Sequence, residues 1–188
     1  KHSRALQFTL ALGIPTLVLT PDALETYGWS DDYGLLLFAD PSEAPSAFEF
    51  MISDARPLMA LLFLGTWQFV SQTSDLTLIR LLGVLGLVLS AAISPRITDS
   101  SQTSKRLPGG FAIGVAFCLP TFQIYAQWAT AWAFSWSILL ALLGYVAFRA
   151  RKQWMRVIGV LLAAAGFAIY PITPFFIFAV LALRMVLL

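Results

Sequence analysis

The sequence predicts an all-α, polytopic integral membrane protein with about seven transmembrane helices, and three observations lead to this prediction. Hydrophobic residues make up 59% of the 188 residues and charged residues only 12%, about half the charged share of ordinary globular domains. The mean hydropathy is +0.78. From Pro108 to Leu188 the chain has no acidic residue. A water-soluble surface cannot be built from such a segment, so we expect it to lie in a lipid bilayer.

The N-terminal part combines one apolar run with one acidic segment. Residues 5–20 form a short apolar run interrupted by Pro15, which we expect to be a retained helix because no small-residue cleavage motif follows it. Residues 21–56 contain eight acidic side chains together with several glycines and prolines. This segment is expected outside the hydrocarbon, along the interface that its Trp and Tyr side chains favour. Asp54 and Arg56 are expected to form an ion pair there.

Two helical hairpins are predicted in the middle of the chain. Residues 57–72 and 76–94 form the first hairpin, joined by the polar turn 73–75. Residues 109–128 and 131–148 form the second. Its turn carries three tryptophans, as expected for aromatic side chains at a membrane interface: Trp128, Trp132 and Trp136.

The C-terminal segment is too long for one membrane-spanning helix. As a straight helix, residues 157–188 would extend roughly 48 Å, beyond a hydrocarbon core of about 30 Å. Pro171 and Pro174 each remove a backbone donor near its middle, so two short helices are predicted. The total is seven helices, or six if the first or the last does not cross. The basic loops 95–108 and 149–156 share one side, which the positive-inside rule makes cytoplasmic. Residues 1–188 are thus predicted to form a single membrane domain.

An internal similarity suggests a 3+3 inverted repeat plus one helix. Residues 80–95 and 156–171 are identical at seven of sixteen positions, including Arg80 with Arg156 and Pro95 with Pro171. Each copy would contain three helices, so the second copy would be inverted in the membrane, as in many transporters. The competing interpretation is chance, because Leu, Val, Gly and Ala dominate membrane helices.

Six polar or charged residues in apolar surroundings are candidate site residues. Arg80 lies near the start of its predicted helix, where it could reach toward the membrane surface beside Asp75 or present a fixed positive charge to a cavity or an anionic head group. The others have helical spacing, which favours either interhelical amide contacts or the polar lining of a ligand path: Gln68, Gln72, Gln123, Gln127 and Thr130.

Small residues four apart are predicted to allow close helix packing. Three such pairs occur in the apolar segments, and they indicate packing rather than chemistry: Gly86 with Ser90, Gly110 with Gly114, and Gly159 with Ala163.

Residue types that catalysis and metal binding need are scarce. Cys118 is the only cysteine and His2 the only histidine, which excludes an internal disulfide and argues against a haem, a histidine-based metal site or histidine general-base catalysis. Ion-coupled transport normally uses an acid inside the membrane, but after Pro57 the only acids are Asp75 and Asp99, both in predicted loops. The net charge of +2 gives no indication of a nucleic-acid partner.

Three functions remain. We favour a non-catalytic accessory or structural subunit of a larger membrane complex, whose partners are other transmembrane subunits and lipids. It needs no resident cofactor, although aromatic residues, 14% of the chain, would suit contact with a bound lipid, quinone or pigment. The alternative is a small uncoupled transporter or channel for a neutral or apolar solute. An enzyme that acts on lipid through Asp54 has the least support.

Overall fold

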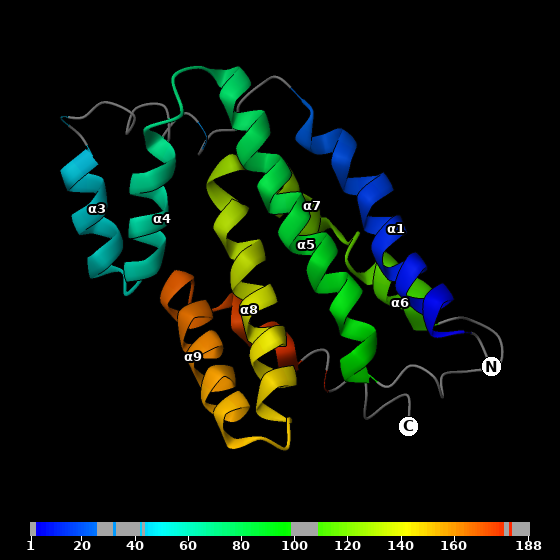
Figure 1. Ribbon diagram of the computed structural model, residues 1–188. Coiled ribbons are helices and arrows are strands. Elements are labelled where there is room, and N and C mark those ends of the chain that lie inside the picture. The colour runs from blue at the N-terminus through cyan, green and yellow to red at the C-terminus, as the bar shows by residue number, and fades with distance from the viewer. Residues whose placement is uncertain are drawn as a thin grey trace.

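The computed structural model describes residues 3–25, 32, 42, 44–98, 109–178 and 181, and all regular secondary structure in them is helical. Three helices lie side by side in one layer (Figure 1): α1 (Arg4–Ala23), α5 (Leu76–Thr98) and α8 (Trp132–Phe148). Two short helices pack on α1 and α5: α6 (Gly109–Ala116) and α7 (Pro120–Gln127). At the other edge lie α3 (Ala44–Ser53), α4 (Pro57–Trp67) and α9 (Gln153–Ile169).

The helix ends follow from local sequence. The Ser3 side chain caps α1 by accepting a hydrogen bond from the Leu6 N–H. The short 3-10 turn η1 (Thr73–Asp75) leads into α5, and Asp75 accepts hydrogen bonds there from the backbone N–H groups of Ser71 and Gln72. Pro57 and Pro120 stand at the starts of α4 and α7, where the missing N–H of proline costs no hydrogen bond.

Within the described residues, two helical segments are long and apolar enough to cross a membrane, Thr73–Ile97 and Ala129–Phe148. A third becomes available if α6 and α7, bent by 58°, are counted as one broken span. At 1.5 Å per residue, the 11 residues of α4 reach only about 16 Å and the 17 residues of α9 about 25 Å. The all-helical fold is therefore confirmed for the described residues, whereas the seven spans are not confirmed and stay a prediction.

Both predicted hairpins are wrong in their packing. The helix expected over residues 57–72 ends at Trp67, and the main packing partners of α4 are α3 and α9. Helix α4 shares a core cluster with the start of α5 but does not lie along it. The eight residues between the end of α4 and the start of α5 are enough for α4 to lie at an edge of the fold and not along α5. In the second predicted hairpin, α6 packs on α1 rather than on α8. Gly110 and Gly114 face α1 so closely that any side chain would meet its backbone, which explains the preference.

The break in the C-terminal segment is confirmed. Helix α9 ends at Ile169, and the 3-10 turn η4 (Thr173–Phe175) follows the first proline. The Thr173 hydroxyl hydrogen-bonds the Ser137 hydroxyl of α8, which holds this turn against the layer. Residues 176–178 and 181 are helical, and the rest of the second predicted short helix lies outside the described residues. So do Lys105 and Arg106 of the first basic loop.

The inverted repeat finds no support in the fold. Its first copy lies in α5, between α1 and α8, whereas its second lies in α9, which packs on α8 and α4 at the edge. Arg80 is buried but Arg156 is exposed. Pro95 lies inside α5, while Pro171 follows the end of α9. The matched residues therefore have different surroundings.

The turn between α3 and α4 holds one residue in a strained backbone conformation. Ala55 has φ of 58°, and the Arg56 and Ala55 N–H groups donate to the carbonyls of Met51 and Ile52, the pattern of a Schellman C-cap that normally favours glycine. Asp54 and Arg56 flank Ala55 and form the predicted ion pair, with 3.3 Å between Nη2 and Oδ2.

Replacing Ala55 by glycine should raise the free energy of unfolding by about 0.5–1 kcal/mol. The left-handed conformation costs an L-residue roughly 1–2 kcal/mol, of which the greater freedom of glycine in the unfolded chain offsets a part. Unfolding in mixed micelles would measure the change. As a control, Ala164→Gly at an exposed position inside α9 should lower stability by about 1 kcal/mol. A loss at both positions would contradict the strained turn.

Candidate functional site

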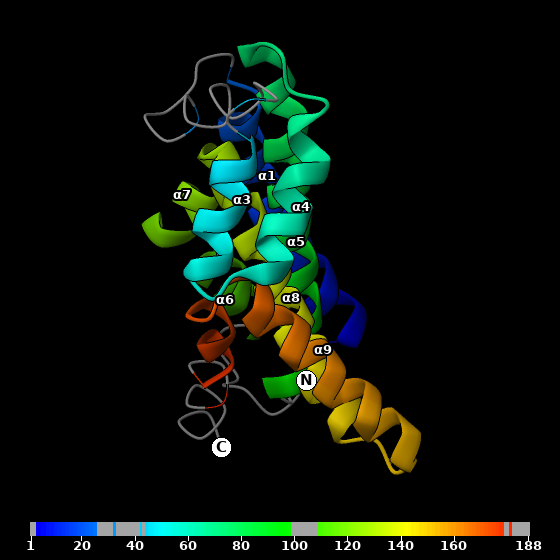
Figure 2. The same ribbon diagram turned by 90° about the vertical axis from the view of Figure 1, so that its left-hand side faces the viewer.

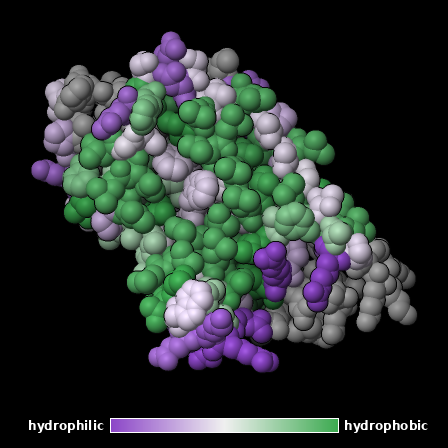
Figure 3. Space-filling model, viewed as in Figure 1, coloured by the Kyte–Doolittle hydropathy of each residue, from purple (hydrophilic) through white to green (hydrophobic). Residues whose placement is uncertain are grey.

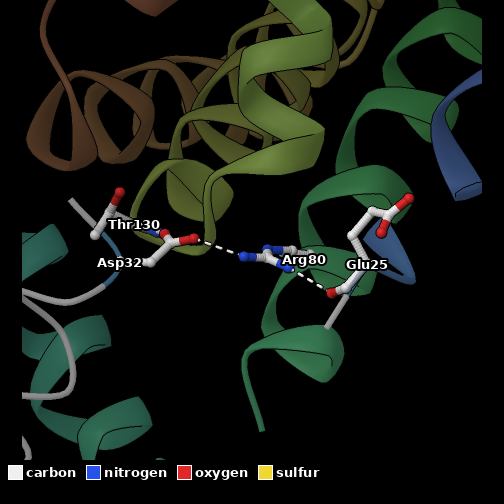
Figure 4. A network of polar contacts seen from close by, with 4 residues as sticks. All are labelled: Glu25, Asp32, Arg80 and Thr130. Atoms are coloured by element: carbon white, nitrogen blue, oxygen red, sulfur yellow. Dashed lines mark hydrogen bonds and ion pairs between the residues drawn. The ribbon is translucent and has the colours of Figure 1, made fainter. Parts of the chain in front are cut away.

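The most unusual polar group in the structure is Arg80, near the start of α5. Its side chain is completely buried, at 0% exposure, and so is that of Asp32. The Arg80 Nη2 lies 2.7 Å from the Asp32 Oδ2, and Nη1 donates at 2.7 Å to the backbone carbonyl of Glu25. Figure 4 shows the Glu25 carboxylate pointing away from this contact. The guanidinium is thus held by one full and one partial negative charge.

Asp32 connects this cluster to a fourth segment. Its second oxygen, Oδ1, accepts a hydrogen bond at 3.2 Å from the Thr130 N–H, which lies in the 3-10 turn η3 (Ala129–Ala131) before α8. The cluster of Glu25, Asp32, Arg80 and Thr130 therefore joins the end of α1, the acidic segment, α5 and the start of α8 (Figure 4). We call it the Arg80 cluster.

The structure brings together two of the predicted candidates, Arg80 and Thr130, through a residue that sequence reasoning missed. The side chain of Arg80 does not reach the surface beside Asp75, as one interpretation expected, but turns into the fold toward Asp32. An arginine in an apolar helix predicts that an acidic side chain or a backbone carbonyl lies close enough to pair with it. Nothing in the sequence singles out Asp32, 48 positions away, from the other acids of residues 21–56.

The predicted glutamine pairs do not act together in the described structure. Gln68 and Gln72 follow the end of α4 at exposed positions, so they do not share a helical face. Gln123 donates at 3.0 Å to the carbonyl of Cys118 and thereby bridges the break between α6 and α7. Gln127 is half-buried at the end of α7. An interhelical amide contact comes instead from Gln7, whose Oε1 accepts from the Gly110 N–H.

The small residues lie where helices approach most closely. A Cβ on Gly86 would stand 2.9 Å from Ser135 of α8, and one on Gly159 would stand 2.6 Å from the carbonyl oxygen of Gly144. Ala163 lies beside Gly144 in the same contact. Ser90 is buried, and its hydroxyl donates to the Gly86 carbonyl within α5. A further α5–α8 tie is the Trp136 indole, which donates at 3.0 Å to the Leu82 carbonyl.

An apolar groove of about 220 Å³ lies along the contact between α8, α9 and the segment after η4. Gly144 and Gly159 line this groove together with aromatic side chains that include Phe148, Phe167 and Phe178. Its lining is almost entirely apolar. The predicted basic loop 149–156 begins immediately after Phe148, at one end of the groove, but its last four residues form the first turn of α9, which begins at Gln153.

The described residues contain no group of three or more His, Cys, Asp or Glu side chains that could hold a metal ion. Compared with protein-family models, curated proteins and solved structures, the chain shows no match. A functional hypothesis therefore has to come from the Arg80 cluster, the groove and the exposed surface.

Proposed function

We propose that this chain is a multi-pass membrane protein that acts as a non-catalytic accessory subunit and packs against partner helices in a larger complex. The observation that supports it most is the exposed apolar surface on helices too short to span. On α4 and the turn after it, Leu61 is 57% and Phe69 77% exposed, and on α9 Leu161 is 62% exposed. Large apolar patches of this kind are typical of surfaces that lipid or another protein covers.

The Arg80 cluster is consistent with a structural role. Its charges are fully buried and bonded within the chain, so they bind α1, α5 and the start of α8 together rather than face a solute path. An intramembrane arginine facing a transported ion would need access to water. The seven-span topology remains part of this proposal, because two or three segments of the described part of the chain meet the length and hydropathy needed.

Copurification from the native host would test the proposal. Tagged full-length protein, extracted in a mild detergent, should migrate with partner subunits in constant stoichiometry, and deletion of the gene should lower the abundance of those partners. Tryptophan at exposed Leu161 should weaken the association without unfolding the chain if α9 contacts a partner. Recovery of a water-soluble monomer without detergent would contradict the membrane part of the proposal.

A second candidate, the uncoupled transporter, is favoured by the 58° break between α6 and α7, because discontinuous helices often form transport sites. Protein that purifies alone and moves a neutral solute across liposome membranes would support this function and exclude the accessory role. Gln123 bridges the break, so Gln123→Leu should then abolish the flux.

A further inference from the structure

We infer that the groove between α8 and α9 binds one anionic phospholipid, with an acyl chain in the groove and the head group at the basic loop 149–156. This inference rests on the proposed membrane location of the chain but not on its proposed accessory role.

The groove matches a hydrocarbon chain in chemistry and form. Its volume is about 220 Å³ and its lining is apolar. Gly144 and Gly159 bring the backbones of the two helices into contact, and both residues line the groove that runs along this contact. Val160, on its rim, is 56% exposed. In a bilayer, an acyl chain laid along such a groove would make van der Waals contacts with both helices.

Among the described residues, no carboxylate forms an ion pair with the basic side chains at the end of the groove. Arg149, Arg151 and Lys152 are exposed, and none of them forms an ion pair with an acid of the described residues. The Arg156 Nε donates to the backbone carbonyl of Ala150, and the Arg149 guanidinium lies over the ring of Tyr145, a lining residue, at 5.8 Å. The segment 109–188 contains no acid at all. A phosphodiester head group would supply the missing negative charge.

The connection between α8 and α9 lies where the head group of a bound lipid would be expected. Figure 2 shows the α8–α9 pair extending beyond the other helices, with the connecting loop at its far end. In Figure 3 hydrophilic side chains gather at this end, directly below apolar surface. Trp154, 57% exposed in the first turn of α9, is typical of side chains at head-group depth. Basic clusters at this depth on the cytoplasmic side recognise anionic lipids.

Native mass spectrometry of the full-length protein, released from a mild detergent, would test the site. Protein exposed to equal amounts of phosphatidylglycerol and phosphatidylcholine with the same acyl chains should retain one phosphatidylglycerol preferentially. The triple variant Arg149→Gln, Arg151→Gln, Lys152→Gln should lower that affinity roughly 100-fold at low ionic strength. The matched control replaces Arg96, Lys105 and Arg106 of the other basic loop by glutamine, and it should retain phosphatidylglycerol.

A second pair of variants tests the groove separately from the charge. Val160→Trp places a large side chain on the groove rim and should abolish retention, whereas Leu161→Trp, at a neighbouring exposed position outside the lining, should not. Circular dichroism would show that each variant remains helical. Equal retention of both lipids by the unaltered protein, or unchanged retention in Val160→Trp, would overturn the inference and leave the accessory role intact. A lipid site without stable partners would instead count against the accessory role alone.

Discussion

Replacing Arg80 by methionine is expected to lower the free energy of unfolding by about 3–5 kcal/mol. The substitution removes the guanidinium but leaves the carboxylate of Asp32 buried at 0% exposure without its counter-charge, and breaking a buried ion pair on one side has this typical cost. The Glu25 carbonyl loses its 2.7 Å hydrogen bond as well. Unfolding in mixed micelles, followed by circular dichroism, would measure the loss.

A double-mutant cycle would separate the ion pair from the other contacts. Asp32→Leu alone should lower the free energy of unfolding by a similar amount, because it leaves the charge of Arg80 buried without its carboxylate. Combining it with Arg80→Met removes both charges, so the double variant should be less destabilised than the sum of the two single variants by about 3 kcal/mol. The Thr130 N–H and the Glu25 carbonyl lose their hydrogen-bond partners in the double variant. Its free energy of unfolding should therefore stay lower than that of the unaltered protein.

Arg96→Met provides the matched control in the same helix. Arg96 is exposed in the last turn of α5, where a cation contributes less than about 1 kcal/mol through the helix dipole. Equal effects of Arg80→Met and Arg96→Met would show that the Arg80 side chain is solvated and would refute the buried cluster.

Replacing Gly159 by alanine is expected to destabilise the protein by about 1–3 kcal/mol, although alanine is the better helix former. The new Cβ would lie 2.6 Å from both the Gly144 oxygen and the Phe148 nitrogen. These are backbone atoms, so α8 and α9 must separate, and inserting a methyl into a close-packed contact typically costs this amount. Gly144→Ala, from the opposite side of the contact, should behave in the same way.

The control substitution, Gly13→Ala, is expected to raise the free energy of unfolding instead of lowering it. A Cβ on Gly13 in α1 would meet no atom within 4 Å, so Gly13→Ala should raise stability by up to about 1 kcal/mol through helix propensity alone. The same unfolding measurement serves both variants. A gain in stability for Gly159→Ala would mean that α8 and α9 are not in backbone contact.

Local features of the sequence predicted that most of the apolar segments are helical, but not the end of α4 at Trp67 or the break between α6 and α7. The break before Pro171 and the Asp54–Arg56 pair needed only neighbouring residues, and both are present. Helix neighbours were not predictable in this way. Helix α8 is apolar on all sides. Its sequence therefore has no single apolar face from which the neighbouring helix could be predicted. The expected partners of α4 and α6 were accordingly wrong.

By itself, then, the sequence determined that this chain is helical and strongly apolar and that its C-terminal segment breaks near Pro171, because these properties depend on composition and on backbone chemistry within a few residues. Only the tertiary structure decided that Arg80 pairs with Asp32, that Gln7 of α1 accepts a hydrogen bond from Gly110 of α6, and that α9 lies at the edge beside a groove. These contacts join residues far apart in the chain. Many acids, amides and apolar faces could satisfy each of them, and only the packed arrangement selects one.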